Sequence, residues 1–139
     1  MPLKDFIRGP GSVGLRQGEI LTGIWLKKDA GFNLHHFEKV GTRNALAIAV
    51  VSLAALIDVS EAGIINKARL AWGSVSPVIA VCSEAEKALA GRPLCQKTLE
   101  GALPLIRAEV SPIDDIRATA EFRRTVAGNL LLRLVELND

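Results

Sequence analysis

The first half of the chain alternates between apolar and polar positions, which is typical of half-buried β-strands. Residues 19–27 show the pattern with Ile20, Thr22, Ile24 and Leu26 on one face and Leu21, Gly23 and Trp25 on the other. A second alternating stretch covers residues 32–40, and only residues 28–31 separate the two. Because a connection this short favours antiparallel pairing, we predict a hairpin of two strands over 19–40.

The apolar run from Ala45 to Asp58 can be interpreted as helix or strand. Its Ala and Leu content favours helix, whereas Ile48, Val50 and Val51 are β-branched. The following residues 63–73 alternate like a strand. Since a strand before them would complete a second hairpin, we predict a strand over 47–57.

The second half has helical spacing. Ser83 and Glu86 form a capping-box pattern with Gly91 as the stop, which predicts a helix over 83–90. A second helix follows through residues 99–110, kinked or restarted at Pro104. The last helix is predicted from about 119 to 137, with an apolar stripe formed by Phe122, Val126, Leu130, Leu134 and Leu137.

Strands followed by helices indicate an α+β fold. We predict an antiparallel sheet of about four strands, in two hairpins, packed under about three C-terminal helices. Residues 1–18 are rich in Gly and Pro and are predicted to be a lead-in segment. Residues 19–139 are predicted to form a single α+β sandwich domain.

The amino-acid composition limits the classes of protein that this chain can belong to, but leaves open whether its apolar residues are all in the core. The 139 residues are 49% hydrophobic but only 4% aromatic, which indicates a dense aliphatic core or a surface that meets another protein. A formal net charge of +2 argues against a dedicated nucleic-acid binder. The N-terminus lacks a signal-peptide pattern, and the run after Ala45 is too short to span a membrane. We therefore expect a cytoplasmic chain with no nucleic-acid or membrane partner.

No motif predicts an active site that is complete in this chain. Residues 9–14 match GxGxxG, but a strand is expected after them where a dinucleotide site needs a helix. His35 and His36 point to opposite faces of a strand, and Cys82 and Cys95 have no metal-binding spacing. Reduced cysteines are the simplest interpretation, with a single disulfide as the alternative. Asp114 and Asp115 precede an arginine-rich helix, so capping and ion pairing explain them better than catalysis.

Five ordered blocks of residues resemble a known family. They are Phe37-Glu38-Lys39-x-x-x-Arg43-x-Ala45, the 48–56 run, Gly63-x-x-x-x-Ala68-Arg69-Leu70-Ala71-Trp72-Gly73-x-Val75-x-Pro77, Ala85-Glu86-x-x-Leu89-x-Gly91, and Pro112-x-x-Asp115-x-Arg117-x-x-x-Glu121-Phe122-Arg123-Arg124. The lead-in, with Pro2-Leu3-x-x-Phe6 and Leu15-x-x-Gly18-Glu19-Ile20-Leu21, also fits. Together they resemble the C-terminal domain of the FAD-binding (medium) subunit of molybdenum hydroxylases, the xanthine dehydrogenase and carbon monoxide dehydrogenase family.

The resemblance implies an α+β sandwich and a role in electron transfer. In that family the FAD accepts electrons from iron–sulfur clusters, after hydroxylation at a molybdenum centre, and passes them to an acceptor. The partners it implies are FAD-binding domains, an iron–sulfur subunit and a molybdenum subunit. The family's FAD-binding half has no counterpart in these 139 residues, so we expect the isolated chain to be inactive, to bind FAD weakly or not at all, and to form a homo-oligomer.

By resemblance, the cofactor-binding residues are Ile20, Leu21, Phe37, Glu38 and Lys39. A hairpin turning symmetrically about residues 29–30 would place Leu21 opposite Glu38 and Ile20 opposite Lys39, so the two segments would form one wall of a site. An apolar residue can pack on the isoalloxazine ring, and a lysine can offset negative charge on reduced flavin. The alternative for Lys39 is an exposed strand lysine, and for Leu21 a core leucine. The alternative for the whole chain is a non-catalytic assembly module; a free-standing small enzyme is a third.

Overall fold

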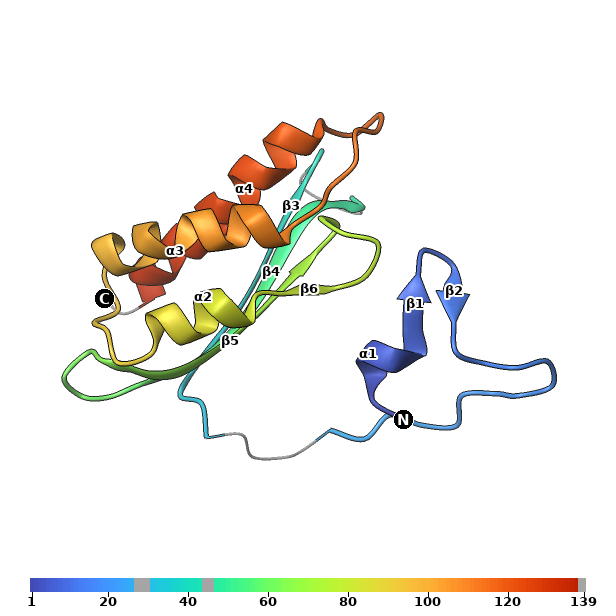
Figure 1. Cartoon of the computed structure of the whole chain (residues 1–139), viewed down its shortest axis with the longest axis horizontal. Helices are drawn as coiled ribbons and strands as arrows, with labels where there is room; N and C mark the ends of the chain where they lie inside the picture. The colour runs from blue at the N-terminus through green and yellow to red at the C-terminus, as the bar shows by residue number, and fades with distance from the viewer. Residues whose placement is uncertain (27–30, 44–46, 138–139) are drawn as a thin grey trace.

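A four-stranded antiparallel sheet forms the centre of the molecule (Figure 1). The computed structural model describes residues 1–26, 31–43 and 47–137. Strands β3 (Leu34–Gly41), β4 (Ala49–Val59), β5 (Ile65–Gly73) and β6 (Ala80–Val81) lie side by side in that order, and each pairs with its neighbours along the chain. The predicted α+β class is confirmed. The strands predicted over 32–40, 47–57 and 63–73 are also confirmed, with each boundary within two residues of the prediction.

One face of the sheet is covered and the other is open. Along β4 the alternate residues Val51, Leu53, Ala55 and Ile57 are buried, whereas Ala54 and Leu56 between them are exposed. This alternation explains why the run is a strand despite its Ala and Leu content, because only one of its two faces needs to be apolar enough for a core. Trp72 of β5 is fully buried on the covered face, where its Nε1 donates a hydrogen bond to the carbonyl of Ala127 at 3.1 Å.

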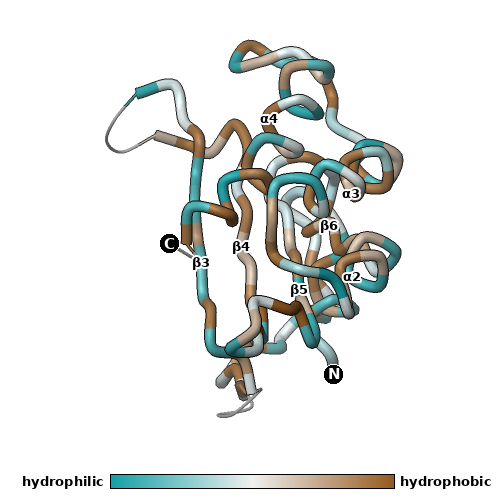
Figure 2. Tube along the Cα trace, turned by 90° about the vertical axis from the view of Figure 1, so that its left-hand side faces the viewer, coloured by the Kyte–Doolittle hydropathy of each residue, from teal (hydrophilic) through white to brown (hydrophobic). Residues whose placement is uncertain are grey.

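Three helices make the second layer (Figure 2). They are α2 (Ser83–Leu89), α3 (Gln96–Glu109) and α4 (Ala120–Leu132), and a 3₁₀ turn η1 (Arg133–Leu137) follows. Helix α2 packs on β5, α4 packs on β4, and α3 packs against both α2 and α4. Three C-terminal helices over one face of the sheet confirm the predicted layering.

A separate N-terminal unit lies near the edge strand β6 and the loop that leads into it (Figure 1). It consists of α1 (Leu3–Phe6) and a two-stranded sheet of β1 (Ile7–Gly9) and β2 (Ser12–Val13). Its residues Leu3 and Ile7 line a small cavity together with Ile79 and Val81. The GxGxxG match falls within this hairpin, and the residues that follow Gly14 form no helix.

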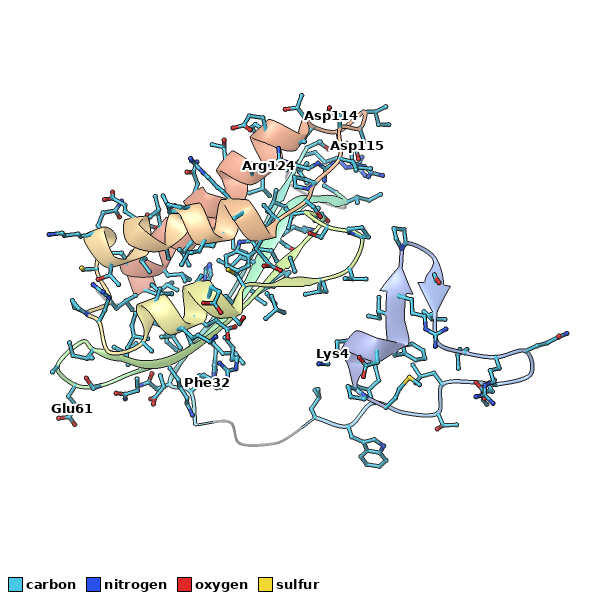
Figure 3. All side chains as sticks on the ribbon, viewed as in Figure 1. Lys4, Phe32, Glu61, Asp114, Asp115 and Arg124 are labelled. Carbon is cyan, nitrogen blue, oxygen red and sulfur yellow. The ribbon has the colours of Figure 1, made fainter. Side chains whose placement is uncertain are left out.

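The predicted strand over residues 19–27 is wrong for the described residues. Residues 19–26 form neither strand nor helix, and β3 pairs with β4 only. The fourth strand of the sheet is β6, which is only two residues long and leaves no periodic signal. The turn predicted at 28–31 falls largely outside the described residues. Phe32, labelled in Figure 3, anchors the chain before β3, with Lys67 Nζ 4.5 Å from its ring centroid.

Three details of the predicted helices need correction. The capping box is absent, since α2 has Cys82 at its N-cap without a side-chain cap, and Glu86 turns toward β5 instead. Helix α3 is continuous through Pro104, so of the two predicted alternatives, a kink or a restart, the restart does not occur. The apolar stripe predicted for the last helix is buried only in its middle. Leu130 and Leu134 are buried, whereas Phe122 and Leu137, near the two ends of the helical segment, are exposed.

Candidate functional site

Two of the predicted cofactor-binding residues lie together on the open face of the sheet. Phe37 and Lys39 belong to the edge strand β3, and alternation points both side chains away from the helices. Phe37 is 69% exposed, which is unusual for an aromatic residue in a sheet. The two side chains therefore present an aromatic ring and an ammonium group on one accessible surface.

Small residues occupy the middle of the open face beside this pair. In the register of the sheet, Phe37 lies opposite Ala54, which lies opposite Ala71, and Lys39 lies opposite Ser52, which lies opposite Gly73. A Cβ on Gly73 would lie 2.5 Å from Ser52 Oγ, so a larger residue at position 73 would displace the Ser52 hydroxyl. The result is a low, mostly apolar floor next to Phe37 and Lys39.

Lys39 is held at the end of β3 that leads into the β3–β4 connection. Its Nζ donates a hydrogen bond to the carbonyl of Ala47 at 3.0 Å. A single neutral acceptor leaves the charge of the ammonium uncompensated by any carboxylate among the described contacts. Lys39 can therefore stabilise negative charge on a group placed over the open face.

Glu38 lies on the opposite face of β3 and does not join this pair. Its carboxylate is 3.3 Å from His36 Nε2 and forms an ion pair with Arg133 of η1. Residues 38 and 133 are far apart in sequence, so the residue pattern gave no signal for this contact. Glu38 attaches the end of the helical layer to the edge strand, and the prediction that it faces the same site as Lys39 is not supported by the geometry.

Ile20 and Leu21 are not beside β3 in the structure. Ile20 is 80% exposed and Leu21 is 52% exposed, both in the stretch without regular structure. The predicted register is not formed, because β3 is the edge strand of the sheet and, among the described residues, pairs with β4 alone. The alternation of residues 19–26 is real, but within the described chain no strand pairs with them, so the predicted wall is not formed.

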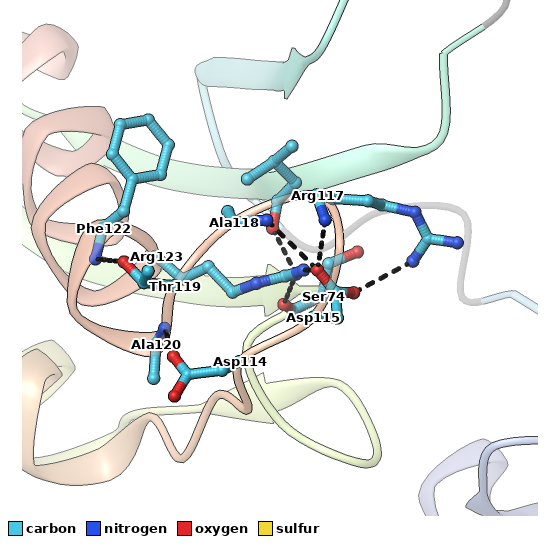
Figure 4. Close-up of polar contacts among 10 residues, drawn as sticks. Ser74, Asp114, Asp115, Arg117, Ala118, Thr119, Ala120, Phe122 and Arg123 are labelled. Carbon is cyan, nitrogen blue, oxygen red and sulfur yellow. Dashed lines mark hydrogen bonds and ion pairs between the residues drawn. The ribbon is translucent and has the colours of Figure 1, made fainter.

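The aspartate–arginine block before α4 is a structural cluster, as the sequence predicts (Figure 4). Arg123 is only 4% exposed, and its Nη1 donates to the carbonyls of Val50 and Ser74, both at 2.9 Å. Its Nη2 lies 2.6 Å from Asp115 Oδ1. Hydrogen bonds from the backbone N–H of Arg117 and from the Arg123 guanidinium lower the pKa of Asp115 to about 2.

Neighbouring residues complete the start of α4. Thr119 is the N-cap and accepts a hydrogen bond from the backbone N–H of Phe122, while Asp114 accepts one from Ala120. Figure 3 shows Asp114 and Asp115 on the same loop, at the opposite end of the sheet and its helical layer from Glu61. Capping and ion pairing therefore account for both aspartates.

The described residues supply neither a metal centre nor a membrane span. Across residues 1–26, 31–43 and 47–137, no group of three or more His, Cys, Asp or Glu side chains could hold a metal ion. Over the same ranges, no helix is long and apolar enough to cross a membrane. Cys82 and Cys95 are free thiols.

The fold and sequence define the class of protein. The family of CO dehydrogenase flavoprotein C-terminal domains matches residues 35–137, and the chain belongs to this family. The resemblance predicted from the sequence is thereby confirmed.

Individual relatives agree with this assignment. The chain is 27% identical to the nicotinate dehydrogenase FAD-subunit of Eubacterium barkeri, over 100% of this chain and 48% of the relative. It is also 27% identical to the carbon monoxide dehydrogenase medium chain of Afipia carboxidovorans, over 96% of this chain and 46% of the relative. The chain thus spans about half the length of the curated relatives it matches.

Solved structures show the same fold. A chain of the cyanide-inactivated Cu,Mo-CO dehydrogenase superposes with a TM-score of 0.83 at 29% identity, covering 95% of this chain and 46% of that chain. A chain of quinoline 2-oxidoreductase from Pseudomonas putida 86 superposes with a TM-score of 0.86 at 24% identity, covering 96% of this chain and 45% of that chain. The second likeness supports the fold alone.

Proposed function

We propose that this domain forms one wall of the flavin site in an FAD-binding subunit of a molybdenum hydroxylase. The observation that carries the proposal is the pairing of exposed Phe37 with Lys39 on the open face of a domain that belongs to this family. The same proposal places the subunit in the cytoplasm, with an iron–sulfur subunit and a molybdenum subunit as partners.

The residues present fit the ring of FAD and not its pyrophosphate. The open face offers an aromatic side chain, a floor of small residues and a lysine, which suit a flat ring that gains negative charge on reduction. A pyrophosphate site in the dinucleotide-binding manner needs a glycine loop that leads into a helix. Here the Gly9–Gly14 loop lies in the β1–β2 hairpin, so the phosphates require residues from the half of the relatives that this chain does not span.

When bound, FAD would supply a two-electron acceptor between the iron–sulfur clusters and a final acceptor. Phe37 would pack against the ring and exclude water from one side of it. Lys39 would exchange its hydrogen bond to Ala47 for a contact with the ring's polar edge, and so favour the reduced, more negative form. Ile20, Leu21 and Glu38 remain proposed contributors by family resemblance, although Glu38 would act by holding β3 against η1.

Reconstitution tests the flavin role. The part of the Eubacterium barkeri nicotinate dehydrogenase FAD-subunit outside the region that matches this chain is joined ahead of this full chain in one polypeptide. The joined protein is loaded with FAD, and the flavin reduction potential is measured. We expect Lys39→Gln to lower the potential. We expect Lys87→Gln, at a surface lysine that pairs with Glu84, to leave it unchanged. Equal potentials in all three proteins would contradict the role of Lys39. The isolated chain should show no micromolar FAD binding by absorbance titration.

A non-catalytic assembly module is the second candidate function. It is favoured by the exposed apolar side chains of the open face, Phe37, Leu56 and Val81, which a second copy could cover. In that case the isolated chain should self-associate in light scattering, and Phe37→Asp should dissociate the assembly. A strict monomer at high concentration would contradict the homo-oligomer that we expect.

A further inference from the structure

The edge strand β3 carries Phe37 and Lys39 but is paired on one side only. Among the described residues its backbone pairs with β4 alone, and the register shifts between Val40 and Gly41, next to Lys39. A register shift of this kind locally disrupts the ladder of hydrogen bonds. The positions of Phe37 and Lys39 therefore depend on what else holds this strand.

The covered face of β3 is unusual because two of its side chains are ionisable. His36 and Glu38 alternate there with the partly buried Leu34 and Val40. The side chains of His36 and Glu38 are 18% and 20% exposed. An apolar residue would suit position 38 better for stability alone, because a carboxylate largely removed from water destabilises the fold unless it is paired. Glu38 therefore indicates a role other than packing.

Glu38 has a partner at each of its two carboxylate oxygens. Arg133 of η1 forms an ion pair with Oε1, and the Nε2 of His36 lies 3.3 Å from Oε2. His36 comes from the same face of the same strand, so it can orient the carboxylate but cannot attach β3 to another element. Arg133 follows Glu38 by 95 residues and belongs to the helical layer. Of these two partners, Arg133 is thus the one that joins the strand to that layer.

The backbone that carries Arg133 is fixed by the core. Leu134, the next residue, is fully buried, and helix α4, which leads into η1, packs on β4. A contiguous series of contacts therefore runs from the core through Arg133 and Glu38 to the backbone of β3. Phe37 and Lys39 are the residues on either side of Glu38, and both point to the open face.

We propose that Arg133 is a positioning residue for the flavin site. Through Glu38 it holds β3 from the covered face, and so fixes Phe37 and Lys39 on the open face. This inference rests on the proposed function for the identity of the ligand, whereas the attachment of β3 to η1 is present without a ligand. Loss of the ion pair should therefore loosen the strand in the chain alone and weaken the action of Lys39 on bound flavin.

Hydrogen exchange in the full chain measures the attachment of β3 without flavin. We expect Arg133→Gln to speed the exchange of the β3 amides that pair with β4 by about tenfold. The amides of β5 serve as the internal reference for global unfolding and should change less. Glu136→Gln, which removes the exposed partner 3.8 Å from Arg133 Nε and spares Glu38, should leave β3 unchanged. Equal exchange of β3 in the two variants would overturn the proposal.

The flavin reduction potential of the joined protein described above distinguishes positioning from the plain effect of a charge. Arg133→Gln should lower the potential by about half of the shift that Lys39→Gln causes, and should add little to that shift when both changes are present. Arg133 acting as a remote charge would give effects that add. Additive effects would therefore overturn the positioning role.

Glu38→Leu gives the sharpest comparison, because the two explanations predict opposite signs. Loss of a negative charge near the flavin favours the reduced, more negative form and raises the potential. Loss of the attachment of β3 weakens the action of Lys39 and lowers the potential. A lowered potential supports the positioning role, and an unchanged or raised potential contradicts it.

The outcomes separate this inference from the proposed function. A potential that responds to Lys39→Gln but not to Arg133→Gln would overturn the positioning role and leave the function standing. A potential that does not respond to Lys39→Gln, together with faster exchange of β3 in Arg133→Gln, would contradict the function and support the attachment of β3 by Arg133.

Discussion

Residues 35–137 and residues 1–26 both contain alternating apolar side chains, but these side chains differ in how far they are buried. In the first region, apolar residues of each strand face three helices, and Leu53, Ile57 and Trp72 are fully buried. In the second, Ile20, Trp25 and other apolar residues stay in water. The difference shows that an alternating apolar pattern indicates a segment that can be buried as a strand. Whether it is buried within this chain depends on the presence of neighbouring strands and helices.

The largest expected effect compares the same substitution in the two regions. Leu53→Ala should lower the free energy of unfolding by about 2.7–5 kcal/mol, because it opens a cavity in the core. Leu26→Ala should change it by less than about 0.5 kcal/mol, since this side chain is exposed. Urea unfolding of the isolated chain measures both. Similar losses would mean that residues 19–26 are packed in the isolated chain.

Arg123 ties three segments of the larger region together. Arg123→Ala should cost about 3 kcal/mol, because the carbonyls of Val50 and Ser74 and the carboxylate of Asp115 lose a buried donor. Arg124→Ala, at the next position, loses only a 3.9 Å ion pair with exposed Glu121 and should cost less than about 1 kcal/mol. Chemical denaturation of the two variants gives their free energies of unfolding. Equal losses in the two variants would contradict the proposed role of Arg123 in joining the three segments.

Acid should weaken this same cluster. The pKa of Asp115 is lowered from an ordinary value of about 3.8 to about 2 in the folded chain, so Asp115 stabilises the fold above its ordinary pKa. That contribution declines as the pH falls through about 4 and is lost below about 2. Thermal unfolding between pH 5 and 2 should be less pH-dependent in Asp115→Asn than in the parent, whereas Asp114→Asn should retain the parent's dependence.

The smallest effect distinguishes the two thiols. A hydrogen bond with Thr98, 3.3 Å from Sγ to Oγ1, lowers the pKa of Cys95, whereas burial raises the pKa of Cys82. Thiolate is the reactive form, so iodoacetamide should modify Cys95 first and at lower pH. Mass spectrometry of the labelled peptides gives the order, and Thr98→Val should slow the labelling of Cys95. Faster labelling of Cys82 would show that the core is open.

Much of the secondary structure of residues 35–137 could be predicted from the sequence, because it follows from patterns among residues that are close in the chain. Alternation placed β3 and β5, and β4 was predicted because a strand there would complete a hairpin with β5. The position of Asp114 and Asp115 before an arginine-rich helix correctly suggested capping and ion pairing. The capping box failed because Glu86 accepts the backbone N–H of Leu70 at 2.9 Å, a contact between elements that spacing cannot reveal. The hairpin over 19–40 failed for a related reason, since alternation predicts a strand without naming its neighbour.

The candidate site was predictable only in part. Phe37 and Lys39 lie two residues apart on one strand, so alternation alone places them on one face. The same rule places Glu38 on the other face, and only the fold shows that Arg133 meets it there. The small-residue floor from Ser52 to Gly73 depends on the register of three strands, which the turns between them fix and the residue pattern does not.

The order of the strands has a consequence for how the chain folds during synthesis. Because β3, β4, β5 and β6 pair strictly in the order in which they are made, each new strand meets an edge that is already formed. Antiparallel neighbours of this kind close short loops and keep the entropic cost of each step low. The final step is different, since Arg123 reaches back to Val50 across 73 residues. We therefore expect the sheet to assemble first on the ribosome and to become a stable domain only when α4 has emerged and docked.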